Sequence, residues 1–513
     1  MTGQILSAAD LTSDQAVDAT VCIIGSGAGG AVLAAGLVEQ GIDVVMLEAG
    51  SHYTREQFTG DSGWAFDRMY QERGGRATKD LAVTILQGRT VGGTTTINWT
   101  TCYRTPDRVL NHWAERWGLT GLTPDALRPH FDAVERRLNI TDWPVAAANR
   151  NNQVLLRGGE ALGWETHGLR RNVRGCLNSG YCGLGCPVDA KQAMGVSYLQ
   201  DAVRDGLRIY SNTEARRLVH ADGRVTEVVA DVVDPESDHP TGVTVRVRAK
   251  IVVSACGSIN GPALFLRSGI DVGGRMGRRT FIHPVSGIAG LYEQPTTPWH
   301  GAPQSAASHH FVDRGPGKMG YFMESAPMQP MLASTVGYLY GLAHADFMKS
   351  LGNVGVVIAL GIDGMLEDDP GGAVEVARDG RIWLDYPVRA PLVEALRDSA
   401  LNMARCHFAA GATTIASLHT EAITMTSLDE LGRLEAAPYG AHEQSIFTAH
   451  VMGGCTMGAD PATSVVDPEH RLRGFDNVFV VDGSVLPTSL GVNPSETIYG
   501  LAHRARAFVA AAV

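Results

Sequence analysis

The spacing of apolar positions near the start of the chain changes from that of a strand to that of a helix. An apolar run over residues 21–24 ends at a glycine-rich turn, and an Ala- and Leu-rich stretch of helical spacing continues to Gln40, where Gly41 closes it. A second apolar run over residues 44–47 ends on Glu48. The order of strand, helix and strand predicts a βαβ unit with parallel strands.

The remaining chain also divides by its pattern, although residues 52–87 show no clear period. Helical spacing predicts helices within residues 107–138 and over residues 390–410 and 499–513. Strand-like runs predict one strand over residues 207–218, two or three more up to residue 249, and another over residues 478–482. A buried strand is also predicted from residue 250, and it enters a helix through a glycine turn.

Residues 286–440 alternate strand-like runs with one long helical stretch, which predicts an antiparallel sheet backed by helices. Within them, residues 327–351 form a long apolar run that is interrupted by histidine and aspartate. We expect a buried core helix there. The alternative is a hydrophobic wall, or a lip facing a membrane, that serves an apolar substrate.

Composition narrows the class of protein. The chain has 513 residues, 44% of them hydrophobic and 19% charged, which is ordinary for a soluble protein with a large core. A net charge of −11 argues against nucleic acid or an anionic membrane as the main partner. Because the chain shows neither a spanning apolar segment nor an export signal, we expect a cytoplasmic protein without predicted membrane contact.

The glycine turn after the first strand has the spacing of a dinucleotide-binding loop. Gly25 permits the tight turn, Gly27 lets backbone N–H groups approach a pyrophosphate at the helix N-terminus, and Gly30 allows close packing of helix and strand. Glu48, after the second strand, is placed to accept hydrogen bonds from ribose hydroxyls. The pattern predicts a dinucleotide but does not separate FAD from NAD.

A second motif, GRTVGGTTTINWTTCYRTP over residues 88–106, is too rich in small residues for a core and suits a flat polar ligand. Following a dinucleotide fingerprint, it resembles the glucose–methanol–choline (GMC) oxidoreductases, which are FAD enzymes. The resemblance covers nearly the whole chain, although Cys256 and Gly261 depart mildly from the family's second signature. It implies that FAD is the cofactor.

The resemblance also implies contacts along the cofactor. The 88–106 loop would follow the flavin, Ala215 the adenine, and Asp482 would make a further flavin contact, unless it is an ordinary turn cap. The expected cofactor contacts are Gly25, Gly27, Ala28, Gly29, Gly30, Glu48, Ala49, Arg89, Gly92, Gly93, Thr94, Asn98, Trp99, Thr101, Ala215, Asp482, Gly483, Pro494 and Thr497. The start of the last helix would face the pyrimidine end, where its positive terminus stabilises an anionic reduced flavin.

His450 is the expected catalytic base. It opens a glycine-rich loop, HVMGGCTM, which matches the family's HxxGxCxM pattern, and Asn493 occupies the position of the base's partner, a His or Asn in the family. Alcohol oxidation moves a hydride from carbon, here to flavin N5, and a proton from oxygen to a base. We expect His450 to take the proton and Asn493 to orient the substrate oxygen.

A cysteine segment, CLNSGYCGLGCPVDAK, places Cys176, Cys182 and Cys186 close together. Zinc sites usually show CxxC spacing, which is absent, and no signal points to an oxidising compartment for a disulfide. Three thiolates before a proline resemble iron–sulfur runs, although no fourth ligand is evident. We expect a structural segment without a metal, with an iron–sulfur cluster as the alternative.

Three features, the cysteine segment, the NWTTCYRTP ending and DGRIWLDYPV, resemble bacterial long-chain alcohol oxidases. This implies an apolar, long-chain or aromatic alcohol as substrate, oxidised to an aldehyde or ketone, with O₂ or a quinone or cytochrome as electron acceptor. A sugar dehydrogenase that passes electrons through a cluster to a partner subunit, and a non-redox FAD-dependent lyase, are the alternatives.

Together these patterns predict an α/β fold, α+β overall. A Rossmann-like FAD-binding domain (residues 17–106, 192–285 and 441–513) would be interleaved with a substrate domain (286–440), and residues 107–191 would form a helical cover with the cysteine segment.

The presence of Asn493, rather than a second histidine, leaves one titratable group in the catalytic pair. We therefore expect kcat/KM to fall with decreasing pH below a single dominant pKa. A pH–rate profile measures this, and two ionisations on the acid side would contradict it.

Overall fold

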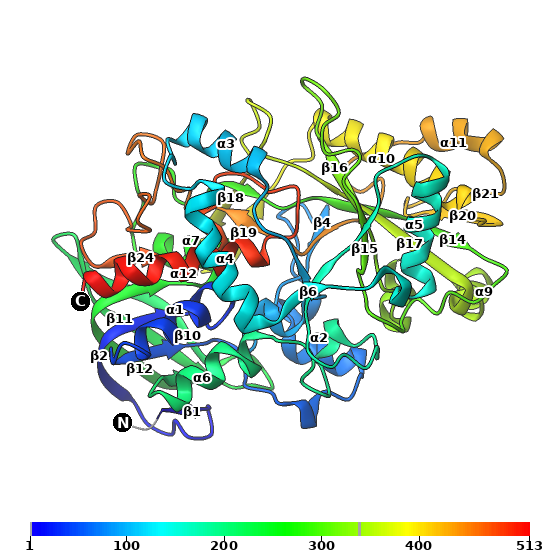
Figure 1. The fold of residues 1–513 in the computed structure, drawn as a ribbon. Helices are drawn as coiled ribbons and strands as arrows, with labels where there is room; N and C mark the ends of the chain where they lie inside the picture. The colour runs from blue at the N-terminus through cyan, green and yellow to red at the C-terminus, as the bar shows by residue number, and fades with distance from the viewer. Residues whose placement is uncertain (1–2, 337–339) are drawn as a thin grey trace.

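The structure is a computed structural model that describes residues 3–336 and 340–513. Two sheets dominate it, and they lie at opposite sides of the view in Figure 1. The N-terminal helix and the C-terminal helix pack against each other within the same half of the molecule. The two ends of the chain therefore lie side by side.

The first sheet has the strand order β1-β9-β3-β2-β12-β11-β10, with β24 also paired to β12. Strands β1, β9, β3, β2, β12 and β24 pair in parallel, whereas β11 pairs antiparallel with both β12 and β10. The bounds are β1 (Gln4–Leu6), β2 (Gln15–Ile24), β3 (Val44–Leu47), β9 (Arg208–Tyr210), β10 (Thr213–Ala221), β11 (Arg224–Val233), β12 (Pro240–Ser254) and β24 (Val478–Val480). The predicted Rossmann-like unit is confirmed.

One strand was predicted where the chain forms two. Residues 207–218 divide into β9 and β10, because Asn212 between them adopts a left-handed conformation with φ of +52°. A strand does not continue through such a residue, and the chain turns from a parallel into an antiparallel pairing there.

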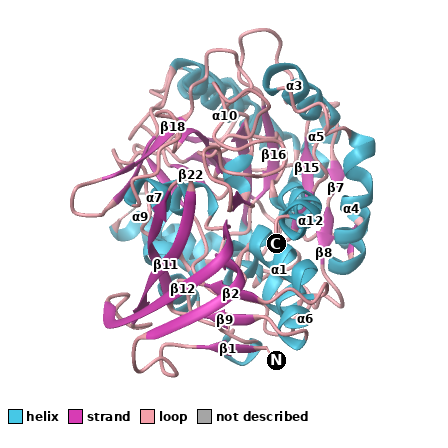
Figure 2. Cartoon of the chain, turned by 90° about the vertical axis from the view of Figure 1, so that its left-hand side faces the viewer, coloured by secondary structure: helices cyan, strands magenta, loops and turns pink. Residues whose placement is uncertain are grey.

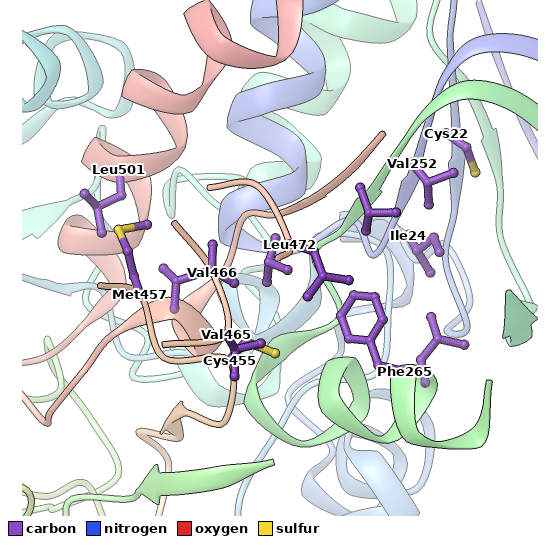
Figure 3. Close-up of a cluster of buried hydrophobic side chains, with 14 of the residues drawn as sticks. Cys22, Ile24, Val252, Phe265, Cys455, Met457, Val465, Val466, Leu472 and Leu501 are labelled. Atoms are coloured by element: carbon purple, nitrogen blue, oxygen red, sulfur yellow. The ribbon is translucent and has the colours of Figure 1, made fainter. Parts of the chain in front are cut away.

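Alternate residues of β2 enter different cores, as the two-residue period of a strand requires. Val21 and Ile23 pack with the helices α1 (Ala28–Val38), α6 (Tyr198–Arg204) and α12 (Ser495–Ala511) on one face, which Figure 2 shows beside the strands. Cys22 and Ile24 pack on the other face with α7 (Gly257–Arg267) and the segment after His450, as Figure 3 shows. A strand with both faces buried reads as a continuous apolar run.

The second sheet has the order β21-β20-β14-β17-β16-β15-β7, and β22 pairs with both β14 and β4. All its pairs are antiparallel except that of β22 with β4. The bounds are β4 (Val83–Ile85), β7 (His167–Gly168), β14 (Val285–Leu291), β15 (Ala306–Ser308), β16 (Tyr321–Ser325), β17 (Val354–Gly361), β20 (Thr414–Ser417), β21 (Thr424–Met425) and β22 (Ile446–Thr448). Helices α5 (Arg150–Ala161) and α10 (Ala390–Ala409) back this sheet, as expected.

Smaller elements join the halves. A three-stranded sheet contains β5 (Thr101–Cys102), β6 (Ile140–Asp142) and β8 (Arg170–Asn172), and a four-stranded sheet contains β13 (Arg278–Phe281), β18 (Gly372–Val376), β19 (Ile382–Asp385) and β23 (Met452–Gly453). Four further α-helices are α2 (Ser62–Met69), α3 (Asp107–Trp117), α4 (Pro124–Leu138) and α11 (Leu431–Glu435). Helix α4 packs on α12.

The core helix predicted over residues 327–351 is wrong; part of that run, residues 337–339, lies outside the described residues. One short helix precedes these residues, α8 (Pro330–Val336), and another follows them, α9 (Gly341–Ser350). Helix α9 has no buried residue. Tyr340 and Leu342 are 88% and 84% exposed. Met328, Ala333 and Leu351 of this run are buried, at 6%, 1% and 3% exposed, but α9 itself lies at the surface and is not a core helix.

Within the described ranges, no helix combines the length and the apolar composition that a membrane crossing requires.

Asn477, which is 1% exposed, links three strands of the first sheet just before β24. Its Nδ2 donates to the carbonyls of Val225 and Lys250, and its Oδ1 accepts from Val225 N–H. We expect N477A to lower the free energy of unfolding by about 2–4 kcal/mol, because buried backbone groups lose their partners. Denaturant unfolding measures this. N353A, which removes a less buried asparagine that also bonds two carbonyls, should have a smaller effect; equal losses would contradict the argument.

Candidate active site

A cavity of about 670 Å³ lies where segments of both sheets meet. Most residues that were predicted to contact the cofactor line it, and these are Gly25, Gly27, Ala28, Gly29, Glu48, Ala49, Arg89, Gly93, Thr94, Asn98, Trp99, Thr101, Ala215, Asp482, Gly483 and Pro494. His450 and Asn493 line the same cavity. Residues that are far apart in the sequence are thus brought together around one space.

Gly30, Gly92 and Thr497 are not on the cavity wall, and each supports it from behind. A Cβ at Gly30 would lie 2.1 Å from the Gly25 carbonyl oxygen, so helix α1 packs there without room for a side chain. Gly92 N–H donates to Ser26 Oγ at 3.0 Å. The Thr497 hydroxyl is fully buried and pairs with that of Thr105 at 2.9 Å.

The Glu48 carboxylate ties the glycine turn to the end of β3. Its Oε2 accepts from the backbone N–H and the hydroxyl of Ser26 at 3.0 and 2.6 Å, and its Oε1 accepts from Gly50 N–H at 2.8 Å. Burial raises the pKa of this carboxyl, while the hydrogen bonds from Ser26 and Gly50 lower it. Carboxylate oxygens have further lone pairs, so the group keeps capacity for hydroxyls of a ligand.

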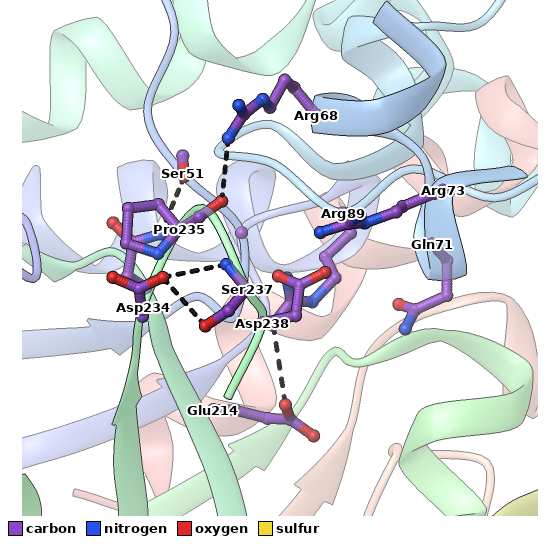
Figure 4. Close-up of polar contacts among 12 residues, drawn as sticks. Ser51, Arg68, Gln71, Arg73, Arg89, Glu214, Asp234, Pro235, Ser237 and Asp238 are labelled. Atoms are coloured by element: carbon purple, nitrogen blue, oxygen red, sulfur yellow. Dashed lines mark hydrogen bonds and ion pairs between the residues drawn. The ribbon is translucent and has the colours of Figure 1, made fainter. Parts of the chain in front are cut away.

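Arg89 lies between two acids at the edge of the cavity. It forms ion pairs with Asp238 and, at 3.7 Å, with Glu214. Figure 4 shows these three residues together beside the turn that begins at Asp234. The side chain is therefore held in place from the β10–β12 region of the sheet.

Lys191, at the end of the cysteine segment, holds the loop that was expected to follow the flavin. Its buried Nζ donates to the carbonyls of Thr96, Asn98 and Cys182 at 2.6, 3.0 and 2.7 Å. Burial lowers the pKa of this amine to about 8. The segment thus acts as a support for residues 96–98, a role that its sequence did not reveal.

The cysteines of this segment are free thiols. No group of three or more His, Cys, Asp or Glu side chains is arranged to hold a metal ion in the part of the chain that the structure describes. Burial raises the pKa of Cys176, and the neighbouring sulfurs of Cys182 and Cys186 also contribute to the rise.

At the other end of the cavity, His450 lies between two partners. Its Nε2 is 3.3 Å from Asn493 Nδ2, and its Nδ1 is 3.1 Å from Nδ1 of His283. Desolvation by the surrounding protein lowers the pKa of His450 to about 4, so the ring is neutral near pH 7. A neutral imidazole with one face on a cavity is able to accept a proton.

The fully buried His283 is held by Asp363. The N–H groups of Ile282 and His283 donate to its carboxylate at 2.8 and 3.1 Å, as does the hydroxyl of Tyr386 at 2.8 Å. His283 has φ of +43°, an uncommon conformation for a histidine. No role was assigned to His283 from the sequence.

Glu324 and Gln304 are two further residues that sequence reasoning missed. Gln304 lines the cavity, and its Nε2 donates to Oε2 of the fully buried Glu324 at 2.8 Å. Burial raises the pKa of Glu324 to about 8, while hydrogen bonding from Asn493 lowers it. A single acid in the apolar strand YFMES was the only signal available.

The start of α12 also faces the cavity. The helix begins at Ser495, four residues earlier than predicted, and Pro494 and Ser495 line the wall. Asp482 caps the short helix that follows it by accepting from Ser484 N–H at 2.8 Å, and it also accepts from Gly257 N–H at 2.8 Å. Asp482 is therefore both the cap of that short helix and one of the residues that line the cavity.

Fold and site together define a dinucleotide-binding domain joined to a second sheet over a shared pocket. Family comparison makes this specific. GMC oxidoreductase models match residues 66–285 and 381–502, and an FAD binding domain matches residues 18–58. The chain belongs to the GMC oxidoreductase family, and its cofactor is FAD, as predicted.

Similar sequences support this assignment. An uncharacterised GMC-type oxidoreductase of Mycobacterium tuberculosis is 34% identical over 97% of this chain and 76% of its own length. A long-chain-alcohol oxidase of Arabidopsis thaliana is 29% identical over 94% of this chain and 67% of its own length.

Solved structures share the fold. Pyridoxine 4-oxidase from Mesorbium loti has a TM-score of 0.69 at 19% identity, covering 96% of this chain and 99% of its own. Formate oxidase from Aspergillus oryzae has a TM-score of 0.71 at 13% identity, covering 97% and 99%.

The wall of the cavity fits FAD. Gly27 leaves open space where a Cβ would project, and Oδ1 of Asn98 has no hydrogen-bond partner among the described residues. An open backbone suits a pyrophosphate, and a free acceptor suits a ligand that carries N–H donors.

Gly27 provides a direct test of the cradle. Its extended backbone, with φ of −70° and ψ of −160°, suits alanine, and an added Cβ would come no closer to the described residues than 3.8 Å, at Gly93 Cα. G27A should therefore fold normally but bind FAD at least about tenfold more weakly, since its methyl enters the cofactor's space. Titration of the apoprotein with FAD measures the affinity, and the Tm of the protein shows whether it folds normally. G432A, a methyl added in open space on α11, is the control; unchanged affinity in G27A would contradict the placement.

Proposed function

We propose that this enzyme oxidises an apolar alcohol, long-chain or aromatic, to the aldehyde or ketone, with His450 as proton acceptor. The observation that carries the proposal is the pair formed by His450 and Asn493 on the wall of the FAD cavity. Bound FAD supplies the hydride acceptor. The protein's own residues must position the alcohol and remove its proton.

Asn493 and His450 divide this work. The Asn493 amide hydrogen-bonds the alcohol oxygen and so orients the carbon that loses hydride, while Nε2 of His450 takes the hydroxyl proton. Because the pKa of His450 is lowered to about 4, the ring stays neutral and available at working pH. Its burial also excludes water, which strengthens the hydrogen bonds of the reacting oxygen.

The preference for an apolar substrate rests on the wall near this pair. Val285, Ile358 and Leu360 line the cavity and belong to an apolar cluster that also contains Phe322. Phe447 lines it as well. The relatives named long-chain-alcohol oxidases support the same class of substrate.

We expect H450Q to lower the rate of anaerobic flavin bleaching by an alcohol by about 100- to 10,000-fold, because the general base is lost. Stopped-flow absorbance measures the rate, and the flavin spectrum confirms that FAD is retained. H407Q is a matched control, since His407 is also buried with a pKa lowered to about 4 but lies outside the cavity wall. Full turnover by H450Q would refute the proposed base.

Steady-state turnover of fatty and aryl alcohols, compared with glucose and choline, tests the substrate class. Consumption of O₂ in the same assay tests whether oxygen accepts the electrons. Preference for a sugar would overturn the apolar assignment.

A further inference from the structure

Two buried oxygens in the active site have no hydrogen-bond partner among the described residues. They are Oδ1 of Asn493 and Oε1 of Glu324, which are 4% and 0% exposed as residues. Gln304, which lines the cavity together with Asn493, donates to Oε2 of Glu324. Burial raises the pKa of Glu324, and hydrogen bonding from the Asn493 amide lowers it. Unsatisfied polar atoms in such a site call for an explanation.

The hydrogen bonds around the two imidazoles limit where the protons are. Gly491 N–H donates to Nε2 of His283 at 3.1 Å, so a neutral His283 carries its proton on Nδ1 and donates it to Nδ1 of His450. A neutral His450 must then carry its own proton on Nε2, the atom that faces Asn493. In this state His450 cannot accept a proton from an alcohol at Nε2.

The orientation of the Asn493 amide distinguishes two states, because rotation by 180° exchanges its oxygen and its NH₂ group. With the oxygen toward His450, Asn493 accepts from Nε2–H and from a protonated Glu324. With the NH₂ group there, Asn493 donates to an ionised Glu324 and, before substrate binds, to the unprotonated Nε2; a bound alcohol takes the place of this second bond, accepting from the amide and donating to Nε2. In the second state His283 carries its proton on Nε2 and gives up the bond from Gly491.

We propose that Glu324 is a positioning residue that sets the orientation of the Asn493 amide, and thereby decides whether Nε2 of His450 is free to accept a proton. This inference rests on the proposed function. The ionised carboxylate holds the amide in the competent orientation because it only accepts hydrogen bonds, whereas the protonated acid donates to the amide oxygen and locks the proton on His450.

The residues around Glu324 allow its ionisation to be followed within a measurable pH range. Its cross-strand neighbours are Ala307 and Ile358, which carry no charge, and Gln304 donates to it. Burial, and then the charge of Glu324, raise the pKa of Tyr103 well above its ordinary value, so Tyr103 stays neutral.

Around the imidazole pair, burial lowers the pKa of both His283 and the nearby His309, and the charge of Arg108 lowers both further. Those rings therefore stay neutral while Glu324, with a pKa raised to about 8, ionises.

The holoenzyme should show the consequence in its pH profile. Because Glu324 must be ionised, kcat/KM should fall about tenfold per pH unit below about pH 8. The single ionisation expected from the sequence then belongs to Glu324 rather than to His450. In E324Q the introduced amide does not titrate and can both donate and accept, so this decline should disappear, while E324D should retain a decline.

Infrared difference spectra between pH 6 and pH 10 give a readout independent of turnover. The carbonyl band of protonated carboxylic acid should shrink with rising pH in the wild type, and the part due to Glu324 should be missing in E324Q. The change due to Asp363, whose pKa burial raises to about 7, should remain in both. D398N is the control, because Asp398 accepts from Tyr321 on the same strand but is half-exposed and outside the cavity wall; its profile should match the wild type.

An unchanged acid limb in E324Q, or a uniform loss of activity at every pH, would overturn the proposal, since a merely structural glutamate would give the latter. If H450Q keeps full activity, the proposed function itself fails. If H450Q is inactive and E324Q keeps the wild-type profile, only the role of Glu324 is refuted.

Discussion

Close contact between backbones at the glycine turn is the constraint on which the site depends. A Cβ at Gly29 would lie 1.8 Å from the Val481 carbonyl oxygen, one at Gly25 would lie 2.3 Å from that of Ala255, and one at Gly93 would lie 2.8 Å from Gly27 Cα. Four chain segments therefore meet here without intervening side chains. Everything that surrounds the cofactor takes its position from this junction.

A second level of organisation comes from buried polar groups that hold loops. Lys191 holds residues 96–98, Glu48 holds the turn at Ser26, and Asp363 holds His283. Each group satisfies several backbone or hydroxyl partners, which makes its burial tolerable. The loops on the cavity wall are thus fixed by side chains that lie behind them.

The sequence was most informative where chemistry requires a local pattern. The βαβ unit and the antiparallel second sheet followed from spacing within short stretches, and the GMC family with its FAD followed from motifs that resemble that family. Glu324 and the support by Lys191 were not foreseeable, since their roles arise from contacts between segments far apart in the chain. The surface position of α9 was missed because apolar content alone does not show what a helix packs against. The assigned domain boundaries, the cofactor contacts and the catalytic roles remain predictions.

Asp363 has a consequence for how the enzyme could be altered. It lies two residues after β17, its carboxylate accepts from the N–H groups of Ile282 and His283, and its backbone carbonyl accepts from the Ser489 hydroxyl. It is not among the residues that line the cavity. A protein engineer who reshapes the pocket for a new alcohol can therefore exchange wall residues of β14 and β17 while the imidazole pair keeps its scaffold.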